Sequence, residues 1–270
     1  MQVMKLATQD KPFFPEKMED KLLYIRKLGF DAFEIDGALL LDRFNEVKAA
    51  VRSTGATVSS VCGGYRGWIG DFDENKRLQG VADISRILEY AALIGAKGIV
   101  VPAAWGMFSL RLPPMVPPRS FEEDRRALLD SLGRLEKVAE STGTQVLLEP
   151  LNRYEDHMIN TVKTARDIIS AGGFRNVKIT ADLFHMNIEE NSIAQSILDN
   201  KELIGHIHLA DSHRYQPGSG HMDFVSGFRA LAAIGYEGYM AFECRVLGDN
   251  PAGEYGRSVE YIKECMTKAR

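Results

Sequence analysis

The chain alternates short β-rich runs with longer amphipathic segments along its whole length, and this rhythm limits its fold more than any other feature of the sequence. Such alternation is typical of a parallel sheet, because two parallel strands need a long crossover between them. Helical periodicity fills most of the intervals, as in residues 83–95 and 127–142. We expect strands at residues 3–8, 32–36, 57–61, 98–103, 145–149, 177–182, 204–210 and 238–243.

A glycine recurs at the same place in three of these units. The segments LGFDAFEID, IGAKGIVVP and IGYEGYMAF put Gly29, Gly95 and Gly235 three residues before an expected strand. Glycine favours the left-handed conformation that ends many helices. The three segments are therefore predicted to be equivalent helix-to-strand joints of a repeated unit.

Eight strand–helix units in 270 residues match a single (β/α)8 TIM barrel, which we expect to span residues 1–270 as one domain. A doubly wound open sheet is the alternative. Its dinucleotide-binding version is disfavoured, since no G-x-G-x-x-G follows the first strand. The proline-rich stretch WGMFSLRLPPMVPPRS has no periodicity and is predicted to be a loop after the fourth strand.

Charge and composition exclude several classes of partner. A net charge of −4 gives no electrostatic reason to expect nucleic acid or an anionic membrane, so a small polar substrate is the simpler expectation. No early apolar run is long enough for a signal peptide or a membrane span, and we expect a cytoplasmic protein. Cys62, Cys244 and Cys265 are widely spaced and form no C-x-x-C pair, which predicts reduced thiols.

The last four expected strands end in Glu149, Asp182, His208 and Glu243. In a TIM barrel the carboxyl ends of all strands meet at one mouth, so these side chains are expected to surround one point. Glu149 follows a run that reads as buried, and a buried carboxylate needs a partner. Oxygen and nitrogen donors suit Mn²⁺ or Mg²⁺, with Zn²⁺ and Co²⁺ as alternatives. We therefore predict a divalent metal site.

Each of these positions also has a simpler interpretation. A carboxylate at a strand end is often a helix cap or the partner of an arginine, and His206 is interpreted as a packed core histidine. Four such groups at equivalent places in successive units favour the metal site.

Other polar and aromatic side chains are expected at the same mouth. His185, Glu155 and Arg214 lie in the loops that follow these strands, and Trp68 or Trp105 would supply the aromatic face that sugar sites use. Solvated loop side chains, or a surface pair of Arg214 with Asp211, are the alternative.

Two further features of this mouth carry weaker signals. Cys62 has the position of a nucleophile but no identifiable base, so a small buried residue is the preferred interpretation. Residues 218–220 contain two glycines whose N–H groups are a weak candidate for binding phosphate.

Four segments, LLEPLNRYE, TADLFHMNIEE, HIHLADSHR and FECR, resemble the tagatose 3-epimerase-like branch of the xylose isomerase-like barrels, also described as sugar phosphate isomerases/epimerases. The resemblance covers nearly the whole chain. It implies a sugar substrate, a homo-oligomer (dimer or tetramer) and site residues with three roles. These are the metal ligands Glu149, Asp182, His208 and Glu243, the acid/base pair Glu149 and Glu243, and the substrate-binding residues Glu155, His185 and Arg214.

Within that branch, the segments CGGYRGWIGDF, VPAAWGMFSLRLPPM, NRYEDHMINT and HRYQPGSG look closest to manganese-dependent epimerases of 3-keto-glycosides. This narrower resemblance implies conversion of a 3-keto-guloside to a 3-keto-glucoside by inversion at C4. The long loop containing Arg111 departs from the pattern of epimerases that act on free ketoses.

Epimerisation next to a ketone requires two bases, one on each side of the substrate, and Glu149 and Glu243 come from strands three apart. Three alternatives use a similar site: a ketose 3-epimerase of the tagatose or psicose type, an aldose–ketose isomerase of the hydroxypyruvate type, and a metal-dependent sugar-binding protein without turnover. A barrel endonuclease for abasic DNA is disfavoured, since it needs a three-metal cluster and a basic face.

Overall fold

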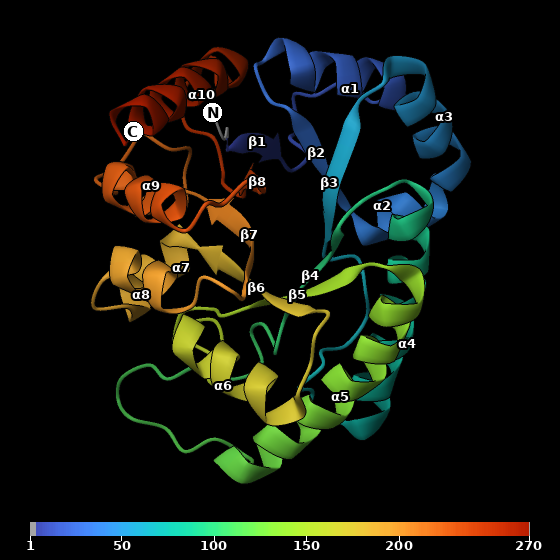
Figure 1. Cartoon of the computed structure of the whole chain (residues 1–270), viewed down its shortest axis with the longest axis vertical. Coiled ribbons are helices and arrows are strands. Elements are labelled where there is room, and N and C mark those ends of the chain that lie inside the picture. The colour runs from blue at the N-terminus through green and yellow to red at the C-terminus, as the bar shows by residue number, and fades with distance from the viewer. Residues whose placement is uncertain (1–3, 270) are drawn as a thin grey trace.

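Eight parallel strands close into a barrel in the computed structural model, which describes residues 4–269 (Figure 1). Each strand pairs with its neighbour in sequence, and β8 pairs with β1 to complete the ring. This confirms the predicted (β/α)8 TIM barrel and excludes the open sheet. The strands are β1 (Lys5–Thr8), β2 (Ala32–Asp36), β3 (Thr57–Cys62), β4 (Gly98–Pro102), β5 (Gln145–Glu149), β6 (Val177–Asp182), β7 (Ile204–Leu209) and β8 (Tyr239–Phe242).

The observed strand bounds agree with the predicted ones to within one or two residues. The predicted first strand began at residue 3, which lies outside the described residues. The last strand ends at Phe242, so Glu243 follows β8 directly instead of ending it. Its backbone N–H still donates to the carbonyl of Leu209 at 3.1 Å. Pairing with β7 therefore continues up to the residue that matters for the site.

Helices surround the barrel and are seen as an outer ring in Figure 1. The predicted helical segments 83–95 and 127–142 lie within or at the end of α4 and α5, which run side by side. The helices are α1 (Met18–Lys27), α2 (Gly37–Asp42), α3 (Phe44–Thr54), α4 (Glu74–Leu93), α5 (Phe121–Thr142), α6 (Val162–Gly172), α7 (Leu183–Glu189), α8 (Ile193–Asp199), α9 (Phe224–Ala233) and α10 (Pro251–Lys268).

The main apolar core lies between the strands and the helices. Side chains alternate along a strand, so one set faces the helices and the other faces the barrel interior. On β5, Val146 and Leu148 belong to the helix-side core, whereas Leu147 and Glu149 point the other way. Glu149 is therefore carried into the interior of the barrel by strand geometry.

The three predicted glycine joints are confirmed. Gly29, Gly95 and Gly235 have φ angles of 96°, 75° and 70°, in the left-handed region that costs other residues free energy. Each of them follows a helix and turns the chain back into the next strand.

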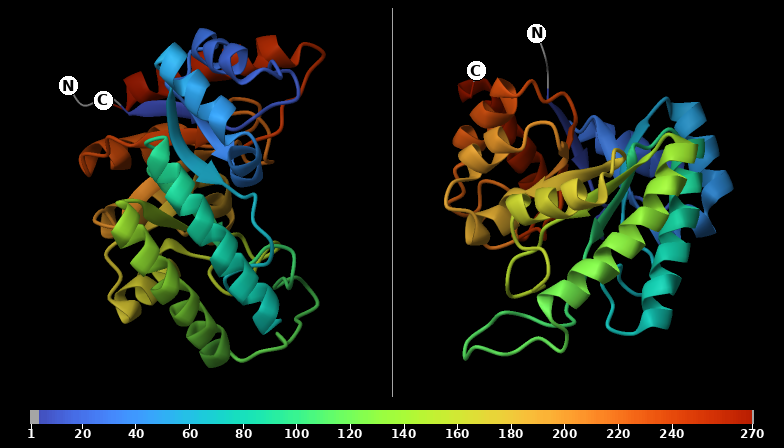
Figure 2. Two further views of the ribbon diagram at one scale, coloured as in Figure 1. Left: turned by 90° about the vertical axis from the view of Figure 1, so that its right-hand side faces the viewer. Right: turned by 60° about the horizontal axis from the view of Figure 1, so that its bottom comes forward.

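The proline-rich stretch after β4 is a loop, as predicted, and it extends away from the barrel (Figure 2). Arg119 holds the end of this loop. Its guanidinium donates to the carbonyl of Asp71 at 3.0 Å and to Oδ1 of Asp124 at 2.7 Å, and it lies 4.9 Å from the ring centre of Phe72. The loop therefore starts and ends at fixed points beside the mouth of the barrel.

Two further expectations concern the chain as a whole. Cys62, Cys244 and Cys265 are free thiols, as predicted. Across residues 4–269, none of the helices combines the length and the apolar character that crossing a bilayer requires.

A substitution at Gly98 tests how closely β4 and β5 pack. A Cβ at this position would lie 1.9 Å from the carbonyl oxygen of Gln145, so an alanine requires the two strands to separate. Gly98→Ala is expected to lower the free energy of unfolding by about 3 kcal/mol, the upper range for overpacking. Gly256→Ala in α10 is the matched control: its Cβ meets open space, so it should be neutral or stabilise by up to about 1 kcal/mol. Guanidinium unfolding followed by circular dichroism measures both, and equal midpoints for Gly98→Ala and wild type would contradict the close approach.

Candidate active site

Three carboxylates and one imidazole meet at the mouth of the barrel. Glu149 ends β5, Asp182 ends β6, His208 lies on β7 and Glu243 follows β8, and each offers a donor atom within 4.8 Å of the others. Nδ1 of His208 lies 2.9 Å from Oε1 of Glu149 and 2.7 Å from Oε2 of Glu243. The structure therefore brings together the four residues that the sequence singled out as metal ligands.

Burial raises the electrostatic cost of grouping these carboxylates. Burial, together with the neighbouring Glu243 and Asp182, raises the pKa of Glu149 to about 8, against the opposing effect of His208. Burial lowers the pKa of His208, but the surrounding carboxylates outweigh it and hold that pKa well above its usual value. These shifts favour protons on the cluster, and a divalent cation would balance the same negative charge.

The donor set fits a divalent cation. Adjacent ligands in an octahedral site lie about 3 Å apart when each is about 2.1 Å from the metal. The contacts of 2.9 and 2.7 Å between His208 and the two glutamates have this spacing. Three carboxylate oxygens and one imidazole nitrogen match the preference of Mn²⁺ and Mg²⁺, and imidazole also admits Zn²⁺ and Co²⁺.

Asp182 has two separate tasks. Its Oδ1 accepts from the backbone N–H of Phe184 at 2.8 Å and caps the short helix α7, so the helix-cap interpretation is correct for this atom. Its Oδ2 pairs with Arg214 and faces the cluster. Burial raises the pKa of Asp182, but Arg214 and His185 reverse this and leave it below the usual value.

Arg214 bridges two of the four candidate ligands. Its guanidinium pairs with Asp182 and, through Nη2, with Oε2 of Glu243 at 2.7 Å. It also lies 4.7 Å from the ring centre of Phe184. Its φ of 65° is positive, which a non-glycine residue adopts at a cost, and such strain is frequent at functional sites. The loop therefore holds this cation over the cluster in a conformation that its backbone alone would not favour.

The alternative of a surface pair between Arg214 and Asp211 is wrong. Asp211 is buried and accepts from the backbone N–H groups of Ser212, Gly218 and Met222, at 2.8, 2.7 and 3.1 Å. It organises the loop after β7. The phosphate candidate at residues 218–220 loses its support as well, because the Gly218 N–H already donates to this carboxylate.

A polar network of His185, Asn152 and Glu155 lies beside the cluster. Nδ1 of His185 accepts from the backbone N–H of Asn152 at 3.1 Å and lies 2.8 Å from its Nδ2. Because Nδ1 accepts, the ring proton lies on Nε2, which points towards Asp182 at 3.6 Å. Burial lowers the pKa of His185, which favours this neutral form. Asn152 also donates to Oε1 of Glu155 at 2.8 Å, so it links two of the predicted substrate-binding residues.

Aromatic side chains complete a small cavity of about 180 Å³ above the cluster. Trp68 and Trp105 meet edge to face with ring centres 6.4 Å apart, and Nε1 of Trp105 donates to Oε2 of Glu155 at 2.9 Å. The buried hydroxyl of Tyr65 has no hydrogen-bond partner among the described residues. The cavity combines apolar faces with a few convergent polar groups, as small-molecule sites do. Both tryptophans that the sequence offered as alternatives line it.

Cys62 also lines this cavity, but as a thiol. Burial and the neighbouring Glu243 and Glu34 raise the pKa of its thiol well above the usual value. Its Sγ lies 3.9 Å from Oε1 of Glu243. This environment opposes thiolate formation, which agrees with the interpretation of Cys62 as a small residue and not a nucleophile.

Two residues escaped the sequence analysis. Glu34 on β2 is 1% exposed and contacts both His206 and His208. A signal was present, since AFEID puts a carboxylate inside an apolar strand just as QVLLE does. Asn152 lies inside the segment LLEPLNRYE, but nothing in the sequence indicated that its amide would connect His185 to Glu155.

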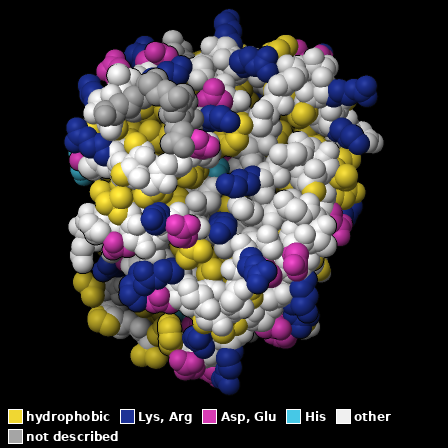
Figure 3. All heavy atoms as spheres, viewed as in Figure 1, with side chains coloured by type: hydrophobic (Ala, Val, Ile, Leu, Met, Phe, Trp, Pro, Cys, Tyr) yellow, Lys and Arg dark blue, Asp and Glu magenta, His cyan; other side chains and the backbone are white. Residues whose placement is uncertain are grey.

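The surface seen in Figure 3 carries charges of both signs. Lys and Arg side chains are spread over that face with Asp and Glu among them. This face is not covered by one sign of charge, and the net charge of −4 gives no electrostatic reason to expect nucleic acid as a partner.

The fold and the site define a class of protein: a (β/α)8 barrel with a carboxylate–imidazole donor set and a small cavity at the carboxyl ends of its strands. The chain belongs to the xylose isomerase-like TIM barrel family, whose sequence profile matches residues 22–265.

Three comparisons describe its relatives. The chain is 54% identical over 262 residues to the 3-dehydro-D-guloside 4-epimerase of Escherichia coli K12, covering 97% of this chain and 100% of that protein. A D-psicose 3-epimerase of Ruminiclostridium cellulolyticum is 30% identical over 81% of this chain and 75% of its own length. The crystal structure of an E. coli 3-keto-D-glucoside 4-epimerase in its apo form superposes with a TM-score of 0.95 at 54% identity, over 97% and 100% of the two chains. These relatives are isomerase-class enzymes by name.

Cation binding is expected to release protons. At pH 7 the raised pKa values leave Glu149, near 8, and His208 mostly protonated, and a cation needs both groups deprotonated. Binding of Mn²⁺ should therefore release about one to two protons per ion, and the affinity should rise from pH 6 to pH 8. Titration calorimetry at pH 7 in two buffers of different ionisation enthalpy measures the number. Glu149→Gln is the control, with about one proton fewer, and an affinity that is flat or falls with rising pH would contradict the assignment.

Proposed function

We propose that this chain is a divalent-metal-dependent sugar epimerase that inverts C4 of a 3-keto-glycoside, converting a 3-keto-guloside to a 3-keto-glucoside. The observation that carries the proposal is the pair Glu149 and Glu243, which line one cavity from strands three apart in the ring. The 54% identity to the E. coli 4-epimerase over nearly the full length of both chains supports the choice of substrate.

The proposed metal ligands are Glu149, Asp182, His208 and Glu243, and the proposed ion is Mn²⁺, with Mg²⁺, Co²⁺ and Zn²⁺ as alternatives. The oxygen-rich donor set supports this choice. When bound, the cation would supply Lewis-acid stabilisation of the negative charge that develops on the substrate's carbonyl oxygen.

Glu149 and Glu243 are the proposed acid/base pair. Inversion at C4 needs removal of the proton on one face of that carbon and delivery of a proton to the other face. Two carboxylates on opposite sides of the substrate can do this in either direction, each acting once as base and once as acid. The environments of the two already differ: the pKa of Glu149 is raised, whereas His208 and Arg214 overcome burial and hold that of Glu243 low. Such a separation is usual for acid/base partners.

Glu155, His185, Arg214 and Trp105 are the proposed substrate-binding residues. All four line the cavity. The Nε2–H of His185 and the guanidinium of Arg214 would donate to hydroxyl or carbonyl oxygens of the sugar. Glu155 would accept from a hydroxyl, and Trp105 would cover an apolar face of the ring.

A ketose 3-epimerase of the tagatose or psicose type is the second candidate. The 30% identity to the D-psicose 3-epimerase over 81% of the chain favours it, since the same two-base chemistry at C3 of a free ketose would use the same site. An aldose–ketose isomerase and a sugar-binding protein without turnover remain as outcomes of the test.

We further propose that residues 1–270 form one domain, that the protein acts in the cytoplasm, and that it assembles as a homo-oligomer, a dimer or tetramer. The closure of all eight strands into one ring supports the first statement. The family resemblance supports the last.

Proton exchange identifies the substrate and the reacting carbon. Protein loaded with Mn²⁺ and then separated from free ion is incubated in D₂O with 3-keto-glycosides, free ketoses and ketose phosphates, and each sugar is examined by proton NMR. We expect deuterium at C4 of the 3-keto-guloside together with the epimeric 3-keto-glucoside. Exchange at C3 of a ketose would move the function to the second candidate. Transfer between C1 and C2 would indicate an aldose–ketose isomerase, and no exchange on any sugar would leave a binding protein.

Replacing either glutamate by glutamine tests whether each one transfers a proton on its own face of the substrate. Glu149→Gln and Glu243→Gln are each expected to lower kcat by on the order of 10²- to 10⁴-fold, the usual contribution of a positioned acid or base. The metal content of each variant is measured alongside the rate, so that loss of the ion is distinguished from loss of the base. A two-base scheme also predicts that each variant retains exchange from one epimer better than from the other. Near-normal turnover with metal bound would rule the scheme out.

A further inference from the structure

Glu34 on β2 is a buried carboxylate to which the proposed reaction gives no role. Among the described residues, no lysine or arginine pairs with it. Four neutral or imidazole donors surround it instead. Oε1 contacts Nε2 of His208 and Nε2 of Gln9, both at 3.0 Å, and Oε2 contacts Nε2 of His206 at 2.7 Å and Oγ of Ser60 at 2.6 Å. Groups on or directly after β1, β3 and β7 contact the two oxygens, and these contacts define the orientation of the carboxylate.

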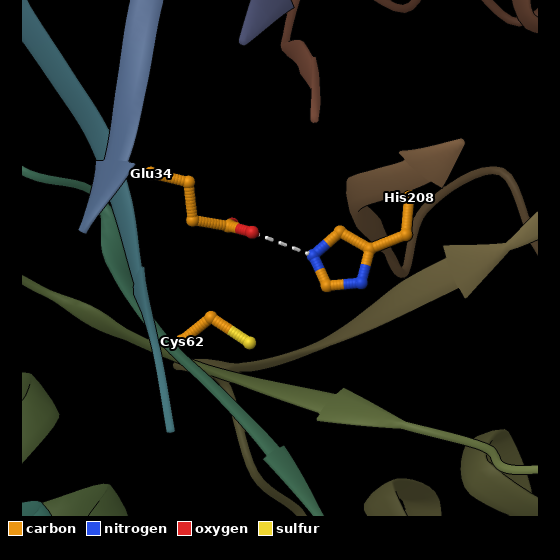
Figure 4. Close-up of side chains that lie close together, drawn as sticks. All are labelled: Glu34, Cys62 and His208. Carbon is orange, nitrogen blue, oxygen red and sulfur yellow. Dashed lines mark hydrogen bonds and ion pairs between the residues drawn. The ribbon is translucent and has the colours of Figure 1, made fainter. Parts of the chain in front are cut away.

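The two nitrogens of His208 face in different directions. Nε2 points to Glu34, as Figure 4 shows, and Nδ1 points to Glu149 and Glu243 at 2.9 and 2.7 Å. A neutral imidazole has one N–H and one lone pair, and the hydrogen bond at one nitrogen decides which nitrogen can bind a metal. A carboxylate accepts hydrogen bonds and cannot donate them when ionised. With Nδ1 bound to the proposed cation, the neutral ring carries its proton on Nε2, where Glu34 accepts it.

We propose that Glu34 is a positioning residue, which fixes His208 in the Nε2–H tautomer and ring orientation that direct the Nδ1 lone pair at the other carboxylates. This inference rests on the proposed metal site. Glu34 would touch neither the ion nor the sugar and would act through His208 alone. The arrangement is a carboxylate–histidine–metal relay built across the barrel interior, from β2 to β7.

His206 and Ser60 supply the support for this relay. Both contact Oε2, the oxygen that His208 does not use. With Oε2 held in this way, the carboxylate cannot rotate to withdraw Oε1 from His208. This gives a physical reason for the second histidine in the segment HIHLA, which lies two residues before His208 and on the same face of β7.

A second cation is the competing interpretation of the same atoms. Glu34, Cys62 and His208 each offer a donor atom within 4.8 Å of the others, and Figure 4 shows the Cys62 thiol beside the imidazole. A cation between Glu34 and Nε2 would have to replace the hydrogen bond between them. The number of ions bound per chain therefore distinguishes a relay, with one ion, from a second metal site, with two.

The first test needs no mutation. Wild-type protein labelled with ¹⁵N-histidine and loaded with Zn²⁺, which is diamagnetic, is examined by long-range ¹H–¹⁵N NMR, and the signal of His208 is assigned by its loss in His208→Gln. We expect a protonated Nε2 and a metal-bound Nδ1. A proton on Nδ1, or two Zn²⁺ ions per chain, would overturn the proposal.

The second test replaces the carboxylate by an amide of the same shape. In Glu34→Gln one terminal atom becomes an NH₂ donor, so the side chain can no longer accept from both histidines. The affinity for Mn²⁺, measured by titration calorimetry, should fall about 10- to 100-fold, the usual effect of removing such a partner. Ser60→Ala keeps the carboxylate but frees one side of it, so a smaller loss is expected and the variant remains informative if Glu34→Gln does not fold.

Asp124→Asn is the matched control. It changes the carboxylate oxygen, Oδ2, that lies 3.0 Å from Nε2 of His157, a buried pair outside the proposed site, and leaves Oδ1 to accept from Arg119. Its Mn²⁺ affinity should equal that of wild type. Wild-type affinity in both Glu34→Gln and Ser60→Ala, with the ion still on Nδ1, would refute the role of Glu34 and leave the proposed function intact. A wild-type protein that binds no divalent ion would refute the proposed function, and with it this inference.

Discussion

The cost of burying negative charge determines how this barrel mouth is built. Glu149, Asp182 and Glu243 lie within one small volume, and three ionised carboxylates cannot share such a space without positive charge. The protein meets this requirement in two ways. The raised pKa values of Glu149 and His208 favour a proton on the cluster, and Arg214 pairs with Asp182 and Glu243. Both devices occupy positions where a divalent cation would balance the same charges.

The barrel topology brings the charged side chains together, but it does not by itself fix their orientations. Parallel strands deliver the four groups to one end of the closed ring, where Glu149, Asp182 and His208 are buried. Strand geometry alone, however, leaves each side chain free to rotate. The orientation comes from contacts between elements that are distant in sequence: Asp211 shapes the loop that carries Arg214, Asn152 connects His185 to Glu155, and Glu34 meets His208.

The sequence predicted the fold and much of the proposed site, because the signals for both are local. Alternating periodicity and the glycines at 29, 95 and 235 are local signals, and they predicted the units and their joints. Parallel strands in a barrel all end on the same side, so Glu149, Asp182 and His208 could be predicted to lie together without information on side-chain packing. The strand ends were displaced by at most two residues, because pairing at the end of a strand depends on the neighbouring strand. Glu243, one residue beyond β8, is an example.

The sequence by itself determined the repeated unit, the ring and the candidate donors at its mouth, because these follow from periodicity and from the shared direction of the strands. Only the tertiary structure decided which side chains touch. Arg214 pairs with Asp182 and Glu243 instead of its sequence neighbour Asp211, since that carboxylate is taken by backbone N–H groups. Glu34 and His208 are 174 residues apart and meet because the pairing of β8 with β1 closes the barrel and brings β2 within reach of β7. No local pattern encodes a contact across the interior of a ring, and that contact orients the histidine on which the proposed chemistry depends.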